Sequence, residues 1–224
     1  MMGTTAEIEP STRLTIDVWA DVLCPWCYVG ERRLDKAIER STHAREIELN
    51  MHTFQLDPTS TREVRPILDY LPKKFGVPVA QARSMEEGMA KQAASEGLTY
   101  EVDRPHSSTL DMLRLVHLGA EHGVSWEYLR SMQTEVFSGN FDAFAGDTLI
   151  RIGTSLGIPA DEIRDVLSTD RYADAVRADH NAAVSLGARG VPFTVLGNRV
   201  GIPGAASVGQ YRAAINQVWE QVNG

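Results

Sequence analysis

Cys24-Pro25-Trp26-Cys27 is the stretch that decides the fold of this 224-residue chain. It holds the only two cysteines of the sequence, with two residues between them. One closely spaced pair cannot build a disulfide framework, and a closed zinc site would need two further ligands for which no second cysteine pair exists. The spacing therefore indicates a reactive dithiol, with two inert buried thiols or half of a zinc site as the alternatives.

The residues on either side of the motif predict a strand before it and a helix after it. Residues 14–18 alternate between apolar and polar side chains, as in a half-buried strand. Pro25 suits the first turn of a helix, where its missing N–H costs little. Cys24 is then expected at the exposed helix start, where unpaired N–H groups favour a thiolate, and Cys27 is expected to be more buried. A C-x-x-C motif in this setting is typical of a thioredoxin-like redox site.

Residues 46–56 predict a second strand, which is parallel to the first because a helix connects them. The alternation of apolar side chains changes phase near Thr53, which indicates a bulge or the end of the strand. Residues 59–186 show helical periodicity and no strand pattern, so they predict a helical block.

Strand patterns return near the C-terminus. Gly197-Asn198 is a hairpin signal between the strands expected at 193–196 and 199–202, and Ser207 is expected to cap a last helix. The order predicts an α/β protein with a thioredoxin-like domain at residues 12–58 and 187–224. Residues 59–186 are predicted to form an inserted helical domain.

Three stretches of the chain resemble the DsbA-like thioredoxin superfamily, and most of all its FrnE-type branch, whose members are often described as predicted dithiol–disulfide isomerases. The stretches are residues 21–30 around the cysteines, Phe54-Gln55-Leu56-Asp57-Pro58, and Gly190-Val191-Pro192-Phe193. The resemblance runs from about Leu14 to the C-terminal helix. It implies a DsbA-like fold and thiol–disulfide exchange without a cofactor or metal.

The resemblance also implies roles for the residues of two motifs. Cys24 is expected to attack a substrate disulfide and Cys27 to resolve the mixed disulfide. Pro25 and Trp26, between the cysteines, are expected to face the substrate and to tune the redox couple. The Val191–Pro192 bond is expected to be cis and to lie against the cysteines, which leaves the Val191 backbone free to pair with an extended substrate. The alternative for Pro192 is a proline that only starts a strand.

Other side chains carry weaker expectations. Asp21 and His52 are candidates for a proton relay, although each is more often a structural or solvated group. Trp19, Tyr28 and Phe54 are expected in the core rather than in a substrate groove. The remaining histidines of the later chain show no metal-ligand spacing and are interpreted as surface or structural residues: His106, His117, His122 and His180.

One departure from the family pattern stands at residues 108–115. The family often has Asn-Thr-x-x-Ala-His-Arg-Leu there, whereas this chain has Ser-Thr-Leu-Asp-Met-Leu-Arg-Leu, so no role of that Asn or His can be transferred. Two other functions stay open. One is a glutathione-dependent isomerase or transferase of the same fold, although such enzymes usually have serine in place of Cys24. The other is a redox-sensing protein that binds clients without catalysis.

The composition limits the partners of the chain. Hydrophobic residues make up 43% and charged residues 23%, which is ordinary for a globular protein, and the net charge is −8. This charge argues against nucleic acid and anionic membranes as main partners. Disulfide-containing proteins or small thiols are the expected substrates, with a low-molecular-weight thiol or a thioredoxin-type protein as reductant. Residues 1–10 lack the pattern of a secretory signal, so a cytoplasmic location is expected.

Overall fold

The computed structural model describes residues 13–223, so the predictions for residues 1–10 and for a domain start at residue 12 lie outside the described residues. The strands are β1 Leu14–Ala20, β2 Ile47–Thr53, β3 Arg65–Pro66, β4 Pro105–His106, β5 Phe193–Leu196 and β6 Val200–Pro203. The α-helices are α1 Pro25–Glu39, α2 Ile67–Phe75, α3 Val79–Ser95, α4 Leu110–Glu121, α5 Ser125–Phe137, α6 Gly146–Ser155, α7 Ala160–Ser168, α8 Ala173–Ser185 and α9 Val208–Asn223. Short 3-10 helices occur at Ala44–Glu46 and Phe141–Phe144.

The main sheet has four strands in the order β2-β1-β5-β6. β1 and β2 are parallel, β5 is antiparallel to β1, and β6 is antiparallel to β5. This arrangement confirms the predicted parallel pair and the presence of the hairpin, whose Asn198 has a positive φ of 54°. The expected strand at 199–202 is shifted by one residue, because Leu196 pairs with Val200 and the turn therefore includes Arg199. β2 ends at Thr53, where the sequence pattern changes phase.

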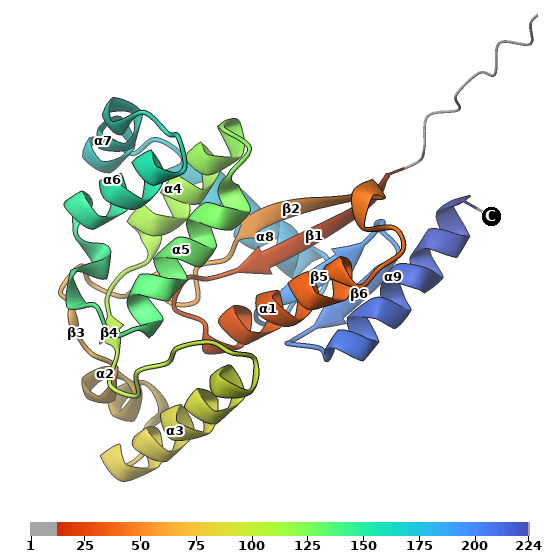
Figure 1. Ribbon diagram of the computed structural model, residues 1–224. Helices are drawn as coiled ribbons and strands as arrows, with labels where there is room; N and C mark the ends of the chain where they lie inside the picture. The colour runs from red at the N-terminus through yellow and green to blue at the C-terminus, as the bar shows by residue number, and fades with distance from the viewer. Residues whose placement is uncertain (1–12, 224) are drawn as a thin grey trace, which may run out of the picture.

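Helices cover both faces of the sheet. α1 and α9 lie side by side on one face, and α8 lies on the other (Figure 1). Ser207 and Gln210 form a reciprocal capping box at the N-terminus of α9. Ser207 Oγ accepts the Gln210 N–H at 3.2 Å, and Gln210 Oε1 accepts the Ser207 N–H at 2.9 Å. The predicted cap is therefore confirmed, and the sheet and its two helical layers form a thioredoxin-like unit.

The chain between β2 and β5 contains α2 to α8, so the α/β, DsbA-like fold with a large helical insertion is confirmed. The expectation that residues 59–186 contain no strand is wrong, because β3 and β4 form an antiparallel pair. Two paired residues per strand are too short to produce an alternating pattern, which explains why the sequence did not reveal them. The boundaries of the two domains stay a prediction.

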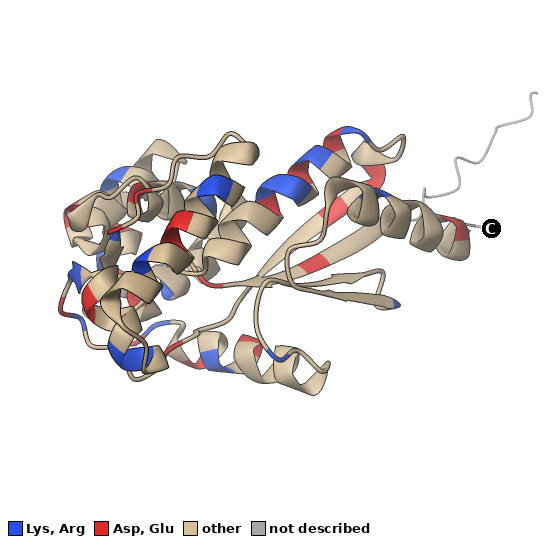
Figure 2. Cartoon of the chain, turned by 90° about the horizontal axis from the view of Figure 1, so that it is seen from below, with Lys and Arg blue, Asp and Glu red and all other residues tan. Residues whose placement is uncertain are grey.

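Charges are spread over the helices. In the view of Figure 2, Lys and Arg segments alternate with Asp and Glu segments, and neither sign gathers into a band. Within residues 13–223, no helix is both long and apolar enough to cross a membrane.

Candidate active site

Cys24 occupies the N-terminus of α1. It is the N-cap residue, and its Sγ accepts the backbone N–H of Cys27 at 3.4 Å. Pro25 follows in the first turn, as its fixed φ allows. The expected position at the helix start is therefore present, but the expected exposure is wrong, because only 4% of Cys24 is accessible.

The loop before β5 covers the Cys24 sulfur. Cys24 Sγ donates to the Val191 carbonyl at 3.4 Å, across 167 residues of sequence, and the Val191–Pro192 peptide bond is cis, as the resemblance implied. A Cβ built at Gly30 of α1 would lie 3.1 Å from Pro192 Cγ, so a side chain at position 30 would press on this loop. The structure thus brings Cys24, Val191 and Pro192 together at one end of α1.

Cys27 lies one turn deeper in α1 and is fully buried. Burial, together with the neighbouring Cys24 and Glu31, raises the pKa of the Cys27 thiol well above its ordinary value. Both cysteines are free thiols. The sulfur that caps the helix is therefore the more accessible of the two and the one that accepts a helix N–H.

Asp21 is buried in the loop between β1 and α1. Its carboxylate accepts the N–H groups of Leu23 at 3.1 Å and Leu56 at 2.7 Å and the Thr109 hydroxyl at 3.3 Å. Burial raises the pKa of Asp21 to about 6, and these hydrogen bonds oppose the rise. Among the described residues, no hydrogen bond joins the Asp21 carboxylate to either sulfur. Its backbone oxygen accepts the Cys24 N–H at 3.2 Å, so Asp21 fixes the loop that presents the cysteine.

His52 is held in another network. Its ring stacks on Trp19 with 4.4 Å between centroids, its Nε2 lies 2.9 Å from Asp17 Oδ1, and its Nδ1 lies 3.4 Å from Asp179 Oδ1. Burial disfavours its charge, but the hydrogen bonds to both carboxylates raise the pKa of His52 to about 9. Among the described residues, no hydrogen bond joins His52 to either cysteine, so the arrangement gives no support to a relay through His52.

Asp179 of α8, which the sequence analysis did not single out, is the centre of that network. It accepts the Thr53 N–H at 2.8 Å and the Thr53 hydroxyl at 3.1 Å, and it lies 3.3 Å from His117 Nε2. Burial alone would raise its pKa, but the hydrogen bonds from His117, His52 and Thr53 hold the pKa of Asp179 well below the usual range. This carboxylate therefore ties α8 to the end of β2.

We predict that Asp179→Asn lowers the free energy of unfolding by about 2–3 kcal/mol, because the variant leaves charged His52 without one of its carboxylates. Because the pKa of Asp179 is lowered, its contribution to the free energy of unfolding is present above about pH 4 and is lost at lower pH. Because the pKa of His52 is raised, its contribution to the free energy of unfolding is present below about pH 6.5 and is lost as pH rises toward 9. Urea unfolding between pH 4 and 9 measures the loss, which should be largest at pH 5–7. Asp174→Asn, at an exposed position of the same helix, is the control; equal effects of the two variants would contradict the assignment.

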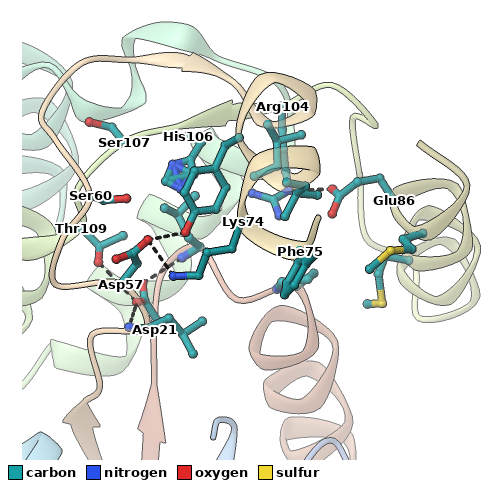
Figure 3. Close-up of a pocket in the computed structure, with 18 of the residues that line it drawn as sticks. Asp21, Asp57, Ser60, Lys74, Phe75, Glu86, Arg104, His106, Ser107 and Thr109 are labelled. Carbon is teal, nitrogen blue, oxygen red and sulfur yellow. Dashed lines mark hydrogen bonds and ion pairs between the residues drawn. The ribbon is translucent and has the colours of Figure 1, made fainter. Parts of the chain in front are cut away.

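A pocket of about 420 Å³ opens beside the start of α1. Leu23, Pro25 and Trp26 form its wall on the motif side, and Trp26 is 44% exposed. Figure 3 shows the polar side chains of the pocket, with Asp57 and Lys74 facing each other and Arg104 joined to Glu86. Residues from α2, α3 and β4 complete the lining, and no local motif in the sequence marked them.

Several secondary expectations can now be compared with the structure. Trp19, Tyr28 and Phe54 are all buried, which confirms core packing. His106 is only 3% exposed, which agrees with the structural alternative and not with a surface position, and it also lines the pocket. Leu113, at the place of the family's His, is completely buried. Within residues 13–223, no group of three or more His, Cys, Asp or Glu side chains is placed to hold a metal ion.

Comparison with known proteins agrees with this geometry. The family description "DSBA-like thioredoxin domain" matches residues 15–216. The chain belongs to the DsbA-like thioredoxin family. The crystal structure of a probable DsbA oxidoreductase, SCO1869 from Streptomyces coelicolor, is similar with a TM-score of 0.87 and 36% identity, covering 93% of this chain and 91% of that chain.

Two further proteins are similar to this chain. Uncharacterized protein YwbO from Bacillus subtilis is 26% identical over 206 residues, which are 90% of this chain and 95% of that protein. The crystal structure of the cytosolic disulfide reductase DsbM from Pseudomonas aeruginosa with GSH is 19% identical with a TM-score of 0.56, covering 92% of this chain and 96% of that chain, and it shares the fold. The resemblance to DsbA-like proteins is therefore confirmed, and the FrnE-type branch is compatible with these matches.

Proposed function

We propose that this protein is a thiol–disulfide oxidoreductase or isomerase in which Cys24 attacks a disulfide and Cys27 resolves the mixed disulfide. The observation that carries the proposal is the placement of Cys24 Sγ between the α1 N-terminus and the Val191 carbonyl, with a hydrogen bond of 3.4 Å on each side. The helix end stabilises the attacking thiolate. The Val191 carbonyl marks where an extended substrate backbone approaches the sulfur.

The exchange proceeds in two balanced steps. The Cys24 thiolate attacks one sulfur of the substrate, the substrate S–S bond breaks, and one substrate half leaves as a thiolate that takes up a proton. Cys27 then loses its proton and attacks Cys24 Sγ, which releases the second substrate half and leaves a Cys24–Cys27 disulfide. The dithiol supplies two electrons, and a low-molecular-weight thiol or a thioredoxin-type protein restores it.

The proposed substrates are disulfides of proteins or small molecules, and the proposed location is the cytoplasm. An exchangeable dithiol without any other cysteine suits a reducing compartment. The fold neighbour DsbM is described as a cytosolic disulfide reductase, and its solved structure is described as one with GSH, which makes glutathione a suitable first reductant to test.

Insulin reduction tests this function. The protein is expected to accelerate the reduction of insulin by dithiothreitol or glutathione over many turnovers, because each cycle regenerates the Cys24–Cys27 dithiol. A glutathione-dependent isomerase without dithiol chemistry would not depend on Cys27. A client-binding protein would protect unfolded proteins equally well after loss of both cysteines, and either outcome without insulin turnover would contradict the proposal.

A further inference from the structure

The pocket beside Trp26 is lined mostly by apolar surface, with a few polar side chains among it. Four of its lining residues are large apolar side chains that are between 44% and 57% exposed: Trp26, Leu56, Phe75 and Met85. Soluble proteins rarely gather such residues without a binding role. Pockets of a few hundred cubic ångströms lined mostly by apolar groups with a few placed polar groups typically bind small molecules.

The interior of the pocket contains a buried cation with free hydrogen-bonding capacity. Arg104 is 2% exposed and its Nε donates to Glu86 Oε2 at 3.1 Å, while its Nη1 is buried without a partner among the described residues. His106 Nδ1, in the same lining, is also buried without such a partner. A buried donor without an acceptor is costly, and a ligand oxygen that reaches Arg104 Nη1 would satisfy it. His106 Nδ1 can donate or accept according to its tautomer.

The electrostatic surroundings of His106 indicate the sign of the charge that this part of the pocket accepts. Burial, followed by the positive charges of Arg104 and Arg65, lowers the pKa of His106 to about 4, and Asp57 only partly opposes this. Arg104 is thus one of several cations around a neutral imidazole. However, Asp21, Asp57 and Glu86 also line the pocket, so a bound group that itself carries several negative charges would be repelled. One carboxylate suits this balance and fits the planar edge of a guanidinium.

We propose that this pocket binds one half of a low-molecular-weight disulfide, an apolar, ring-sized group that carries a single carboxylate, with Arg104 Nη1 holding the carboxylate and Trp26 covering the apolar group. Pro25 and Trp26, between the two cysteines, form the wall nearest to Cys24. Cys24 itself does not line the pocket, so the sulfur of a bound ligand has to extend past Pro25 to reach the proposed nucleophile. This inference rests on the proposed function, since it assigns the substrate class of the same site.

Two aromatic disulfides test the substrate class: 5,5′-dithiobis(2-nitrobenzoate), with one carboxylate on each half, and 4,4′-dithiodipyridine, which has none. The fully reduced protein is mixed with each probe and the released thiol is followed by absorbance over a single turnover. Cys24 attacks, one aromatic thiolate leaves, and Cys27 releases the other, so the protein dithiol supplies both electrons. The rate with the carboxylate probe is expected to saturate at lower concentration.

The variant Arg104→Gln combined with Glu86→Gln removes the guanidinium without leaving Glu86 charged and unpaired, and it keeps the net charge of the protein unchanged. It is expected to raise the half-saturating concentration of the carboxylate probe about tenfold or more. The value for 4,4′-dithiodipyridine should change less than twofold. Equal changes for the two probes, or none for either, would overturn the proposal.

A measurement on the unmodified protein covers the case in which the double variant does not fold. We expect 4-nitrobenzoate to compete with the carboxylate probe and 4-nitrobenzamide, its uncharged analogue, to compete at least tenfold more weakly. Equal competition would overturn the carboxylate assignment. Absence of thiol release from both disulfide probes would instead contradict the proposed function, so the two failures are distinguishable.

Discussion

Cys24→Ser is expected to reduce disulfide exchange to the uncatalysed rate, and Cys27→Ser is expected to accumulate a mixed disulfide with the substrate. A serine at position 24 keeps the helix cap but has no thiolate to attack sulfur. A serine at position 27 leaves the first step intact and removes the thiol that completes the second. Insulin turnover measures the first effect, and mass spectrometry of the protein–substrate adduct measures the second.

The order of thiol reactivity provides an independent check of the same assignment. Iodoacetamide at mildly acidic pH should modify Cys24 before Cys27, because Cys27 is fully buried and burial raises the pKa of its thiol. Cys24 caps the helix and accepts an N–H. Equal labelling of the two cysteines, or a Cys24→Ser protein that still turns over insulin, would exclude Cys24 as the nucleophile.

The parts of the fold that were predictable from the sequence are those with a local signal. Alternation in residues 14–18, the helix-start proline Pro25 and the Gly197-Asn198 turn each determine backbone conformation over a few residues, and the structure contains the corresponding strand, helix and hairpin. The β3–β4 pair could not be predicted, because two residues per strand carry no period.

The surroundings of the cysteines depend on contacts between distant segments. Cys24 was expected to be exposed because a helix N-terminus usually faces solvent, but the loop at Val191 covers it from 167 residues away. Arg104 and His106 enter the pocket from β4 and the residue before it, and neither stands in a recognisable motif. Burial and proximity of this kind follow from tertiary packing, which the residue pattern of one segment does not encode.

Glu31 is a buried acid on α1. Its sequence context does not distinguish it from an acid on the exposed face of a helix. It lies on α1 one turn after Cys27, is 1% exposed, and accepts Gln133 Nε2 at 3.1 Å through Oε1, while its Oε2 has no partner among the described residues. Burial raises the pKa of Glu31 to about 8, against the opposing effects of Arg130 and Gln133. The folded protein therefore holds Glu31 protonated at neutral pH, whereas the unfolded chain ionises it.

This difference gives the stability a defined dependence on pH. Below about pH 4.5 both states bind the proton, so Glu31 has no effect. Between about 4.5 and 8 only the folded state binds it, and the free energy of unfolding is expected to fall by up to about 1.4 kcal/mol per pH unit. Above pH 8 the loss levels off. The pKa of Asp21 is raised to about 6, so Asp21 adds a similar fall in the free energy of unfolding, which ends about two pH units lower.

Glu31→Gln is therefore expected to stabilise the protein by about 3–5 kcal/mol at pH 8 and by little at pH 4.5, because a glutamine needs no ionisation and can still accept from Gln133. Urea unfolding at both pH values measures the difference. Asp21→Asn is the matched control, since its effect should be complete by about pH 6.5 and should leave the fall between pH 6.5 and 8 in place. A Glu31→Gln protein with the wild-type pH dependence between 6.5 and 8 would show that Glu31 is ionised in the folded state and that its charge is compensated by Arg130.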